Sequence, residues 1–360
     1  MVAYIRKLAV ERRSWMNSGD FGEGVAFCQM IPGATAMQTA AYVGLRVRGV
    51  AGAALSLIGF GLPAFCLMLL FAFIYVQTGA LPAVVAIFSG LQAVVVAIVA
   101  NATLSFGKTT LKNWSHAGIA AVAAALFWFN LHPLIVILLA GTAGLLILPS
   151  PNTADLRERR STALIFQRTT FIAILLIVGA ALALLFFLSR DLLNLSFLML
   201  RVDLMAFGGG FASVPIMYHE VVDVNNWLNG QTFMNGIVLG QVTPGPVVIT
   251  ATFIGYLLKG FLGAVIASIS VFTPSFLLVI GLAPFFNRLS ASPIFHKIIL
   301  GILCSFVGLL LSVTIRFALQ IQWDLVHFLL MAAALFALIR KVDLLWVVLA
   351  GTILSVGFIK

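Results

Sequence analysis

Long apolar segments follow one another along almost the whole chain, and they limit what it can fold into. At roughly 15 to 27 residues each, they suit α-helices that cross about 30 Å of hydrocarbon, and not the roughly ten-residue alternation of an outer-membrane barrel. The composition agrees, because 62% of the residues are hydrophobic and 9% are charged, against about 25% charged in soluble domains. We therefore predict an all-α, polytopic membrane protein. The expected spans are 24–43, 51–77, 82–106, 116–130, 133–148, 169–188, 192–217, 232–257, 261–285, 294–317, 323–339 and 343–359.

Lysine and arginine residues lie in the short segments between the spans and give the chain a net charge of +10. Short cytoplasmic loops collect such residues, so membrane topology explains the charge and we expect no nucleic-acid partner. The cysteines, Cys28, Cys66 and Cys304, lie far apart in apolar segments without a neighbouring histidine. This pattern predicts neither a disulfide framework nor a metal site, and we expect no cofactor.

Two of the apolar segments contain a Pro-Gly interruption. The clearer one is Gln241–Pro246, and a degenerate copy, Gln29–Ala34, lies near the N-terminus. Proline lacks an N–H group and its ring crowds the carbonyl four residues back, so a helix breaks there. A broken helix is tolerated within a membrane where it is buried in protein or lines a hydrated cavity. The half-helix after each break directs free N–H groups and a positive dipole end into that space, which favours an anion.

The two interruptions belong to an internal repeat. Its members match at an offset of 212 residues, from Trp15 and Trp227 as far as Gly33 and Gly245, and at 211 after a one-residue gap. We predict two homologous halves joined by a polar linker. The predicted halves are 1–148 and 169–360, and the linker is 149–168; further matches are Phe21 with Phe233, Gln29 with Gln241, Pro32 with Pro244, 42–44 with 253–255, Gly49 and Gly52 with Gly260 and Gly263, and 63–65 with 274–276.

The segment Phe207–Gly210 precedes the repeated block in the second half only. Its partner would fall before Met1, so we expect either that the first half lacks its opening helix or that the native start lies upstream of Met1. The charges leave the relative orientation of the halves open between parallel and inverted. Basic residues such as Arg288 and Lys297 gather opposite the loop after His219, which favours inverted repeats.

These repeated features resemble the chromate ion transporter family. Each half of that family carries a Phe-Gly-Gly helix, a Trp-bearing loop, a Gln-x-x-Pro-Gly-Pro segment, and a Gly-x-x-Gly loop before a Pro-[Ala/Ser]-Phe helix. The match covers nearly the whole chain as two copies, and it departs from the family at Ala34, where the family has a second Pro, and in the first Phe-Gly-Gly helix. The resemblance implies a multi-pass inner-membrane transporter that exports chromate, with sulfate as a related oxyanion.

Both breaks are predicted to form the binding site. Amide and hydroxyl donors would select an oxyanion over chloride, and glycines would let backbone amides approach the ligand. The alternative is that Pro and Gly only kink the helices or allow them to pack closely. The candidate substrate-binding residues are Gln29, Pro32, Gly33, Thr35 and Gln38 in the first half, and Phe207, Gly208, Gly209, Gln241, Thr243, Pro244, Gly245 and Pro246 in the second.

Three ionisable residues are candidates for charge or proton-coupling roles. Arg201 and Asp203 lie in an apolar span, where ionisable groups are functional candidates. Arg201 would supply positive charge to a dianion or, if it sits at a helix end, snorkel to the interface. Glu220, next to His219, would relay protons or belong to a solvated loop, and we favour the solvated loop.

We expect a secondary transporter that carries a tetrahedral oxyanion, chromate in the first place, outward between the two halves by alternating access. The chain contains no ATPase motif, so ion gradients would supply the energy. The alternatives are a transporter of sulfate or another small anion, a non-transporting membrane subunit, and an intramembrane enzyme. Catalysis is disfavoured because the spans hold no paired carboxylates and no His–Cys pair. The expected partners are the oxyanion and the lipid bilayer, and a homodimer is left open.

Overall fold

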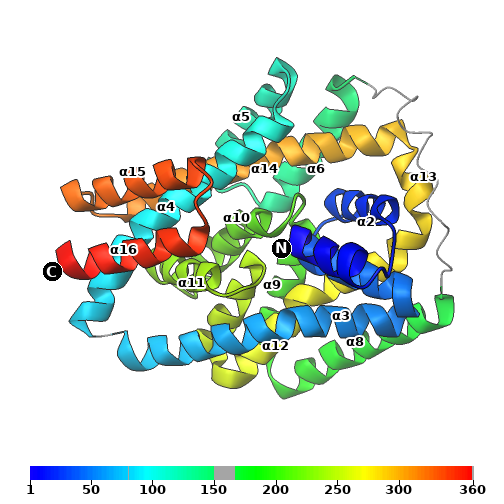
Figure 1. The fold of residues 1–360 in the computed structure, drawn as a ribbon, viewed down its shortest axis with the longest axis horizontal. Coiled ribbons are helices and arrows are strands. Elements are labelled where there is room, and N and C mark those ends of the chain that lie inside the picture. The colour runs from blue at the N-terminus through cyan, green and yellow to red at the C-terminus, as the bar shows by residue number, and fades with distance from the viewer. Residues whose placement is uncertain (80, 150–166, 359–360) are drawn as a thin grey trace.

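The chain is built from helices and the connections between them (Figure 1). The computed structural model describes residues 1–79, 81–149 and 167–358, and these residues form no strand. Among them, five helical stretches are long and apolar enough to cross a membrane. The predicted class, a polytopic helical membrane protein, is confirmed. The five stretches are Thr35–Thr78, Pro82–Thr110, Arg168–Leu188, Val247–Phe285 and Pro293–Gln320.

The first part of the chain runs from α1 to α6. A short helix and a π-helical turn come before α2, and two long helices and two shorter ones follow it. Residues 150–166 of the predicted linker lie outside the described residues. The bounds are α1 Val2–Arg6, η1 Lys7–Arg12, α2 Ser18–Met30, α3 Thr35–Thr78, α4 Pro82–Thr110, α5 Trp114–Trp128 and α6 Pro133–Ile147.

The second part runs from α8 to α16 and repeats this order after two additional helices, α8 and α9. The span expected over 192–217 is interrupted, because the backbone leaves the helical conformation after Met205 and resumes at Gly210. The bounds are α8 Arg168–Leu188, α9 Arg190–Met205, η2 Gly210–Ala212, α10 Ser213–Tyr218, η3 His219–Val224, α11 Gly230–Val242, η4 Val247–Ile249, α12 Thr250–Leu282, η5 Ala283–Phe285, α13 Phe286–Ser290, α14 Pro293–Gln320, α15 Leu325–Ile339 and α16 Leu344–Phe358.

The two Gly-x-x-Gly segments, expected to be loops between spans, are sharp kinks inside α3 and α12. At the first kink, Arg48 has φ −140° and ψ 27°, and Gly49 has φ 63° and ψ −153°. At the second kink, Lys259 has φ −142° and ψ 26°, and Gly260 has φ 60° and ψ −149°. Glycine adopts this left-handed backbone at no steric cost. The sequence predicted the position at which the chain changes direction, but it predicted a loop where the structure has a kink. A change in the backbone torsion angles at the kink is enough to reverse the chain, and no run of polar residues is needed.

Close glycine contacts show that the chain turns back on itself at both kinks. A Cβ atom on Gly44 would overlap the carbonyl oxygen of Gly52, and one on Gly255 would overlap that of Gly263. A straight helix would separate residues eight apart by about 12 Å. Each of α3 and α12 is therefore a pair of helical arms whose backbones touch near the turn, which only glycine allows.

Local geometry agrees between the two parts of the chain at the predicted offsets. Ser14 and Asn226 have φ of 50° and 52°. The side chains of Asn17 and Asn229 cap α2 and α11, each by accepting the backbone N–H three residues later at 2.7 Å. Helices α5 and α6 correspond residue for residue to α15 and α16 at an offset of 211. These agreements support two homologous halves, which stay a prediction.

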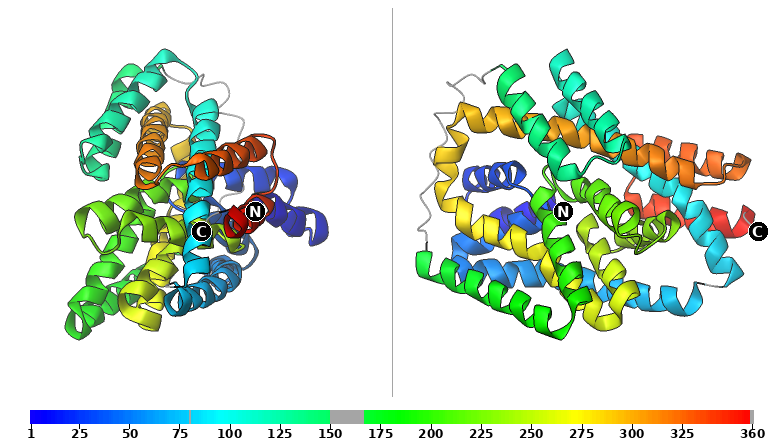
Figure 2. Two further views of the ribbon diagram at one scale, coloured as in Figure 1. Left: turned by 90° about the vertical axis from the view of Figure 1, so that its left-hand side faces the viewer. Right: turned by 180° about the vertical axis from the view of Figure 1, so that it is seen from behind.

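The shorter helices pack across the molecule on the long helices of the other part. α5 and α6 lie against α14, while α15 and α16 lie against α4, and α3 packs along α12 (Figures 1 and 2). Each of α5, α6, α15 and α16 has 15 residues. At a rise of 1.5 Å per residue such a helix is about 22 Å long, shorter than the hydrocarbon core. These four expected spans are thus covered in part by the longer helices beside them.

Candidate functional site

Both predicted helix breaks are present, and they differ in detail. α2 ends at Met30 and α3 begins at Thr35, with Gly33 between them at φ 120°. α11 ends at Val242 and η4 begins at Val247, so the second break contains both prolines of the Pro-Gly-Pro motif. The missing N–H of a proline and the αR-incompatible φ of Gly33 each prevent the helix from continuing.

The two breaks meet at one cavity of 730 Å³. Its wall also contains the loop between α9 and η2, the C-terminal end of α4 and a segment of α14. Three segments that are far apart in the sequence, near residues 30, 210 and 245, therefore share one space. The predicted site residues on this wall are Gln29, Thr35, Gly208, Gly209, Gln241, Gly245 and Pro246.

Residues of the cavity wall carry hydrogen-bond donors without protein partners. Nε2 of Gln241, a residue of the cavity wall, is buried and has no hydrogen-bond partner among the described residues. In α3 the first intrahelical bond runs from the N–H of Gln38 to the carbonyl of Ala34 (3.0 Å), so the amides of Thr35 and Ala36 precede it. Both of these residues line the cavity. The wall can therefore donate hydrogen bonds to an acceptor that enters.

The second break contributes another helix N-terminus. The N–H of Ile249 donates to the carbonyl of Pro246 at 2.9 Å, which leaves the amides of Val247 and Val248 before the first intrahelical bond. Val247 lines the cavity. Two helix N-termini thus end at the same space, and each carries a partial positive charge that attracts anions.

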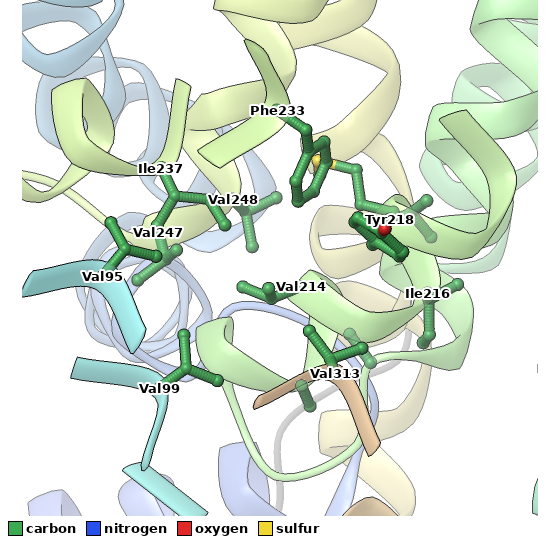
Figure 3. Close-up of a cluster of buried hydrophobic side chains, with 14 of the residues drawn as sticks. Val95, Val99, Val214, Ile216, Tyr218, Phe233, Ile237, Val247, Val248 and Val313 are labelled. Atoms are coloured by element: carbon green, nitrogen blue, oxygen red, sulfur yellow. The ribbon is translucent and has the colours of Figure 1, made fainter. Parts of the chain in front are cut away.

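An apolar cluster packs around the start of η4, at the second break. Figure 3 shows Val247 and Val248 among the side chains of Val95, Val214 and Ile237, which come from α4, α10 and α11. Val248 is fully buried. Because protein interiors are close-packed, this cluster fixes the direction in which η4 and α12 leave the break.

No Lys, Arg, Asp or Glu side chain lines the cavity in the part of the chain that the structure describes. An adjacent hollow of 560 Å³ shares Gln29 and Leu300 with it and carries the basic groups Lys297, His116 and His296. Nδ1 of His116 accepts the backbone N–H of Lys112 at 3.2 Å. The cavity therefore opens beside a basic vestibule at the end where α4 finishes and α14 begins.

Several predicted site residues of the first break do not reach the wall. The N–H of Gly33 donates to the carbonyl of Ala206 (2.8 Å), and the N–H of Ala34 donates to Oγ of Ser275 (3.2 Å). Gln38 is fully buried and donates through Nε2 to the carbonyl of Pro32. Neighbouring segments therefore use the amides of Gly33 and Ala34, and of the predicted residues Pro32, Gly33 and Gln38 do not line the cavity.

Three predicted residues of the second part also lie behind the wall. Oγ1 of Thr243 donates to the carbonyl of Gly240 at 2.9 Å, so this hydroxyl caps α11. Pro244 is exposed outside the cavity wall. The ring of Phe207 packs against that of Phe306, with centroids 6.5 Å apart.

Arg201 and Glu220 belong to a second polar cluster, away from the cavity wall. Oε1 of Glu220 lies 3.6 Å from Arg201 and 3.2 Å from Nε2 of His132. Glu220 and His219 are buried, with relative exposures of 2% and 3%. Our interpretation of this segment as a solvated loop is wrong, because η3 is covered by the α5–α6 connection, to which His132 belongs.

The sequence analysis missed part of the wall and the basic groups of the vestibule. Thr109 and Thr110, at the end of α4, bring hydroxyl groups to the cavity. The vestibule residues His116 and Lys297 belong to different helices and have no common motif. In the sequence, the one feature that marked these residues was their position near the end of an apolar span. Every loop residue of a membrane protein has this feature, so it does not identify a site.

Comparison with known proteins establishes the family. The family model described as chromate transporter matches residues 1–145 and 193–356. The chain belongs to the chromate transporter family. An uncharacterized transporter of Methanocaldococcus jannaschii is 42% identical to it over 359 residues, which are 98% of this chain and 88% of that protein.

Two further relatives of the family carry a substrate in their names. A chromate transport protein of Pseudomonas aeruginosa is 30% identical over 349 residues, 92% of this chain and 79% of that protein. A probable chromate transport protein of Synechococcus elongatus is 29% identical over 337 residues, 93% of this chain and 84% of that protein. No solved structure matches the chain. The family and the apolar helices together make it a multi-pass membrane transporter of the plasma membrane.

Proposed function

We propose that this transporter exports chromate by alternating access, with the anion bound in the 730 Å³ cavity between the two helix breaks. The observation that carries the proposal is the donor set: Gln241 Nε2 without a partner, and two helix N-termini at one space without a carboxylate. A tetrahedral dianion offers acceptors in several directions at once. Its charge is stabilised by each N-terminus by about 0.3–1 kcal/mol, and more where water is excluded.

The basic vestibule supports the direction of transport. Short segments rich in Lys and Arg lie on the cytoplasmic side, and the vestibule contains Lys297 beside the end of α4, where Lys108 and Lys112 lie. A positive potential at the entrance raises the local concentration of an anion. The membrane potential, inside negative, then favours exit of a dianion by twice about 2.3 kcal/mol per 100 mV.

We further propose that the two halves are inverted repeats. Thr103 on α4 and Thr314 on α14 occupy equivalent positions, offset by 211, and their hydroxyl oxygens lie 3.2 Å apart. Further along α4, Gly107 faces Val307, so the two helices run antiparallel. A two-fold axis that relates antiparallel helices is perpendicular to them, and for membrane-spanning helices it lies in the membrane plane.

Reciprocal contacts around the breaks support the same axis. A Cβ atom on Gly33 would overlap Oγ of Ser275, and one on Gly245 would lie 2.6 Å from Cβ of Ala64. Gly33 and Gly245 are equivalent, and so are Ala64 and Ser275. In an isologous interface, a contact between one residue of the first half and another of the second half occurs again with the two halves exchanged. The two contacts above are related in this way.

A flux assay tests the proposed substrate and direction. Purified protein is reconstituted in liposomes loaded with radiolabelled chromate, and efflux is followed while a potassium gradient with valinomycin sets the potential. We expect efflux to rise with a negative interior and to fall when unlabelled chromate competes. Sulfate competition, with chloride as the control, measures selectivity. The proposal would be contradicted if neither chromate nor sulfate left the liposomes faster than it leaves protein-free liposomes.

A further inference from the structure

One carboxyl group lies at the junction of the first break, α9 and α12. Asp203 is fully buried, and its Oδ2 accepts the backbone N–H of Ser275 at 2.8 Å. Its Oδ1 is buried and has no hydrogen-bond partner among the described residues. The Ser275 hydroxyl and the backbone N–H of Ala34 also approach this carboxyl group, so Oδ1 is the acceptor position that is left without a donor.

A second acceptor without a donor lies in the same cluster. Gln38 donates through Nε2 to the carbonyl of Pro32 and to Oγ of Ser275 (3.3 Å), which fixes the orientation of its amide. Its Oε1 is buried without a partner. Gly33 lies between these groups: a Cβ there would overlap Gln38 Nε2 and come within 3.2 Å of Asp203 Oδ2.

No cation compensates Asp203 in the described part of the protein. On α9 itself Arg201 faces Glu220, and Lys259 of α12 pairs with Asp191 at the other end of α9. The segment 31–38 contains no ionisable side chain, and the ion pairs found in the described residues do not include Asp203. A charge buried in this way carries an uncompensated desolvation penalty.

On α10, which also packs against α9, the ionisable side chain is that of Tyr218, and its hydroxyl accepts from Gln320. The basic residue of α8 is Arg168, at the first position of that helix, where the side chain is exposed. The elements packed on α9 therefore direct no charge at Asp203.

We propose that Asp203 is a proton-binding site that couples anion transport to the proton gradient, and that it carries its proton on Oδ1 in the conformation described here. A hydroxyl at Oδ1 supplies a donor, and Oε1 of Gln38 is the acceptor that lacks one. A proton on Oδ1 neutralises this buried carboxyl group and so removes the desolvation penalty of its charge.

The cluster is connected to the cavity on both sides. The N–H of Gly33 binds the carbonyl of Ala206, which leads into the glycine loop Gly208–Gly210 on the cavity wall. Ala34, held by Ser275, also lines the cavity. When Oδ1 releases its proton to cavity water, the carboxylate requires new donors, and the break and the glycine loop have to move to supply them. Proton occupancy and cavity shape are thus linked, and this inference rests on the proposed transport function.

The transport test uses Asp203→Asn, in which an amide group replaces the acidic hydroxyl as donor. We expect wild-type liposomes to accumulate chromate in response to a pH gradient at zero potential. The Asp203→Asn variant is expected to lose that accumulation and to keep chromate exchange across membranes without any gradient. The control Asp191→Asn, an exposed acid on the same helix, should behave as wild type. Gradient-driven accumulation by Asp203→Asn equal to that of wild type would overturn the proposal.

A second measurement does not depend on transport. The infrared carbonyl band of a protonated carboxylic acid should be present in the purified wild type and in Asp191→Asn, and absent from Asp203→Asn. If wild-type liposomes carry neither chromate nor sulfate, the proposed function fails while this band still reports the proton on Asp203. A wild-type spectrum without the band, or a band retained in Asp203→Asn, would refute protonation of this residue.

Discussion

Gln241 is the residue whose environment most directly indicates a ligand, because its buried Nε2 has no protein partner. Gln29 occupies the equivalent position in the first break and also lines the cavity. A hydrogen bond to a charged group contributes about 1.5–3 kcal/mol, so Gln241→Ala should raise KM for chromate by roughly 10- to 100-fold. Gln29→Ala should act in the same direction.

The liposome flux assay measures this effect, and Gln320→Ala serves as the matched control. Gln320 lies at the end of α14, off the cavity wall, and donates to the hydroxyl of Tyr218 at 3.4 Å. Its replacement should leave KM unchanged. An unaltered KM in both Gln29→Ala and Gln241→Ala would exclude the two amides from the binding site.

Substitution of Gly33 tests how much the packing at the first break contributes to stability. Its φ of 120° disfavours any side chain, and a methyl group would overlap Ser275 and Gln38. Strain and overpacking together should lower the free energy of unfolding by about 2–4 kcal/mol in Gly33→Ala. Thermal unfolding in detergent provides the measurement. The control Gly22→Ala, in open space on α2, should gain up to about 1 kcal/mol; equal stability of the two variants would contradict the role given to Gly33.

The residue types alone predicted the two helix breaks, but they did not predict which acceptor each backbone N–H group binds. Proline beside glycine disfavours a helix at Pro32 and at Pro244–Pro246, so both interruptions were predictable, whereas the isolated Pro63 and Pro274 remain inside α3 and α12. Whether the amide of Gly33 faces the cavity depends on the carbonyl of Ala206, more than 170 residues away. No local pattern carries that information, and for this reason the sequence placed Gly33 and Gln38 on the wall although they lie behind it.

At the scale of elements, α4 and α14 form one of the contacts between the two parts of the chain. Thr103→Cys combined with Thr314→Cys should form a disulfide under mild oxidation, because the two hydroxyl oxygens lie 3.2 Å apart. The native cysteines, Cys28, Cys66 and Cys304, are first replaced by serine. A protease site inserted within residues 150–166 then shows whether the two fragments stay linked.

The matched control pair combines Thr103→Cys with Ser305→Cys. Ser305 lies nine residues before Thr314 on the same helix, about 13 Å along its axis, and should give no cross-link. Equal cross-linking in both pairs would show that α4 and α14 do not hold the antiparallel register described. Transport activity before and after reduction would report whether this contact must slide during the cycle.

The helices could be predicted from the lengths of the apolar segments. The helix against which each of them packs could not. The pattern of α5 and α6 indicates apolar helices of marginal length, but it is silent on their packing against α14 in the other part of the chain. The kinks in α3 and α12 were expected as loops, since the Gly-x-x-Gly spacing marks a reversal without specifying its torsions. Tertiary contact decides both features.

For the whole molecule, the inverted arrangement predicts opposite exposure of equivalent positions. Asn113 and Asp324 are the N-cap residues of α5 and α15 and are related by the offset of 211. Asn113→Cys and Asp324→Cys should therefore react with a membrane-impermeant maleimide from opposite sides of the membrane. We expect Asn113→Cys to be labelled in inside-out vesicles and Asp324→Cys in intact spheroplasts.

Both labelling variants are made without the native cysteines, and permeabilised cells give the full extent of reaction for each. Labelling of both positions from one side would establish parallel halves and contradict the proposed axis. The flux assay on the same preparations confirms that each variant is folded. Asn113 lines the basic vestibule. The side from which Asn113→Cys is labelled is therefore also the side on which the vestibule opens.

The crossed packing of the short helices has a consequence for how the protein is made. α5 and α6 leave the ribosome long before α14, the helix on which they rest. During insertion this early pair waits in the lipid or at the translocon until most of the remaining polypeptide has been synthesised. A ribosome that stalls inside the later part would therefore release a product with an unclosed interface, and membrane quality-control proteases would have a long window in which to recognise it.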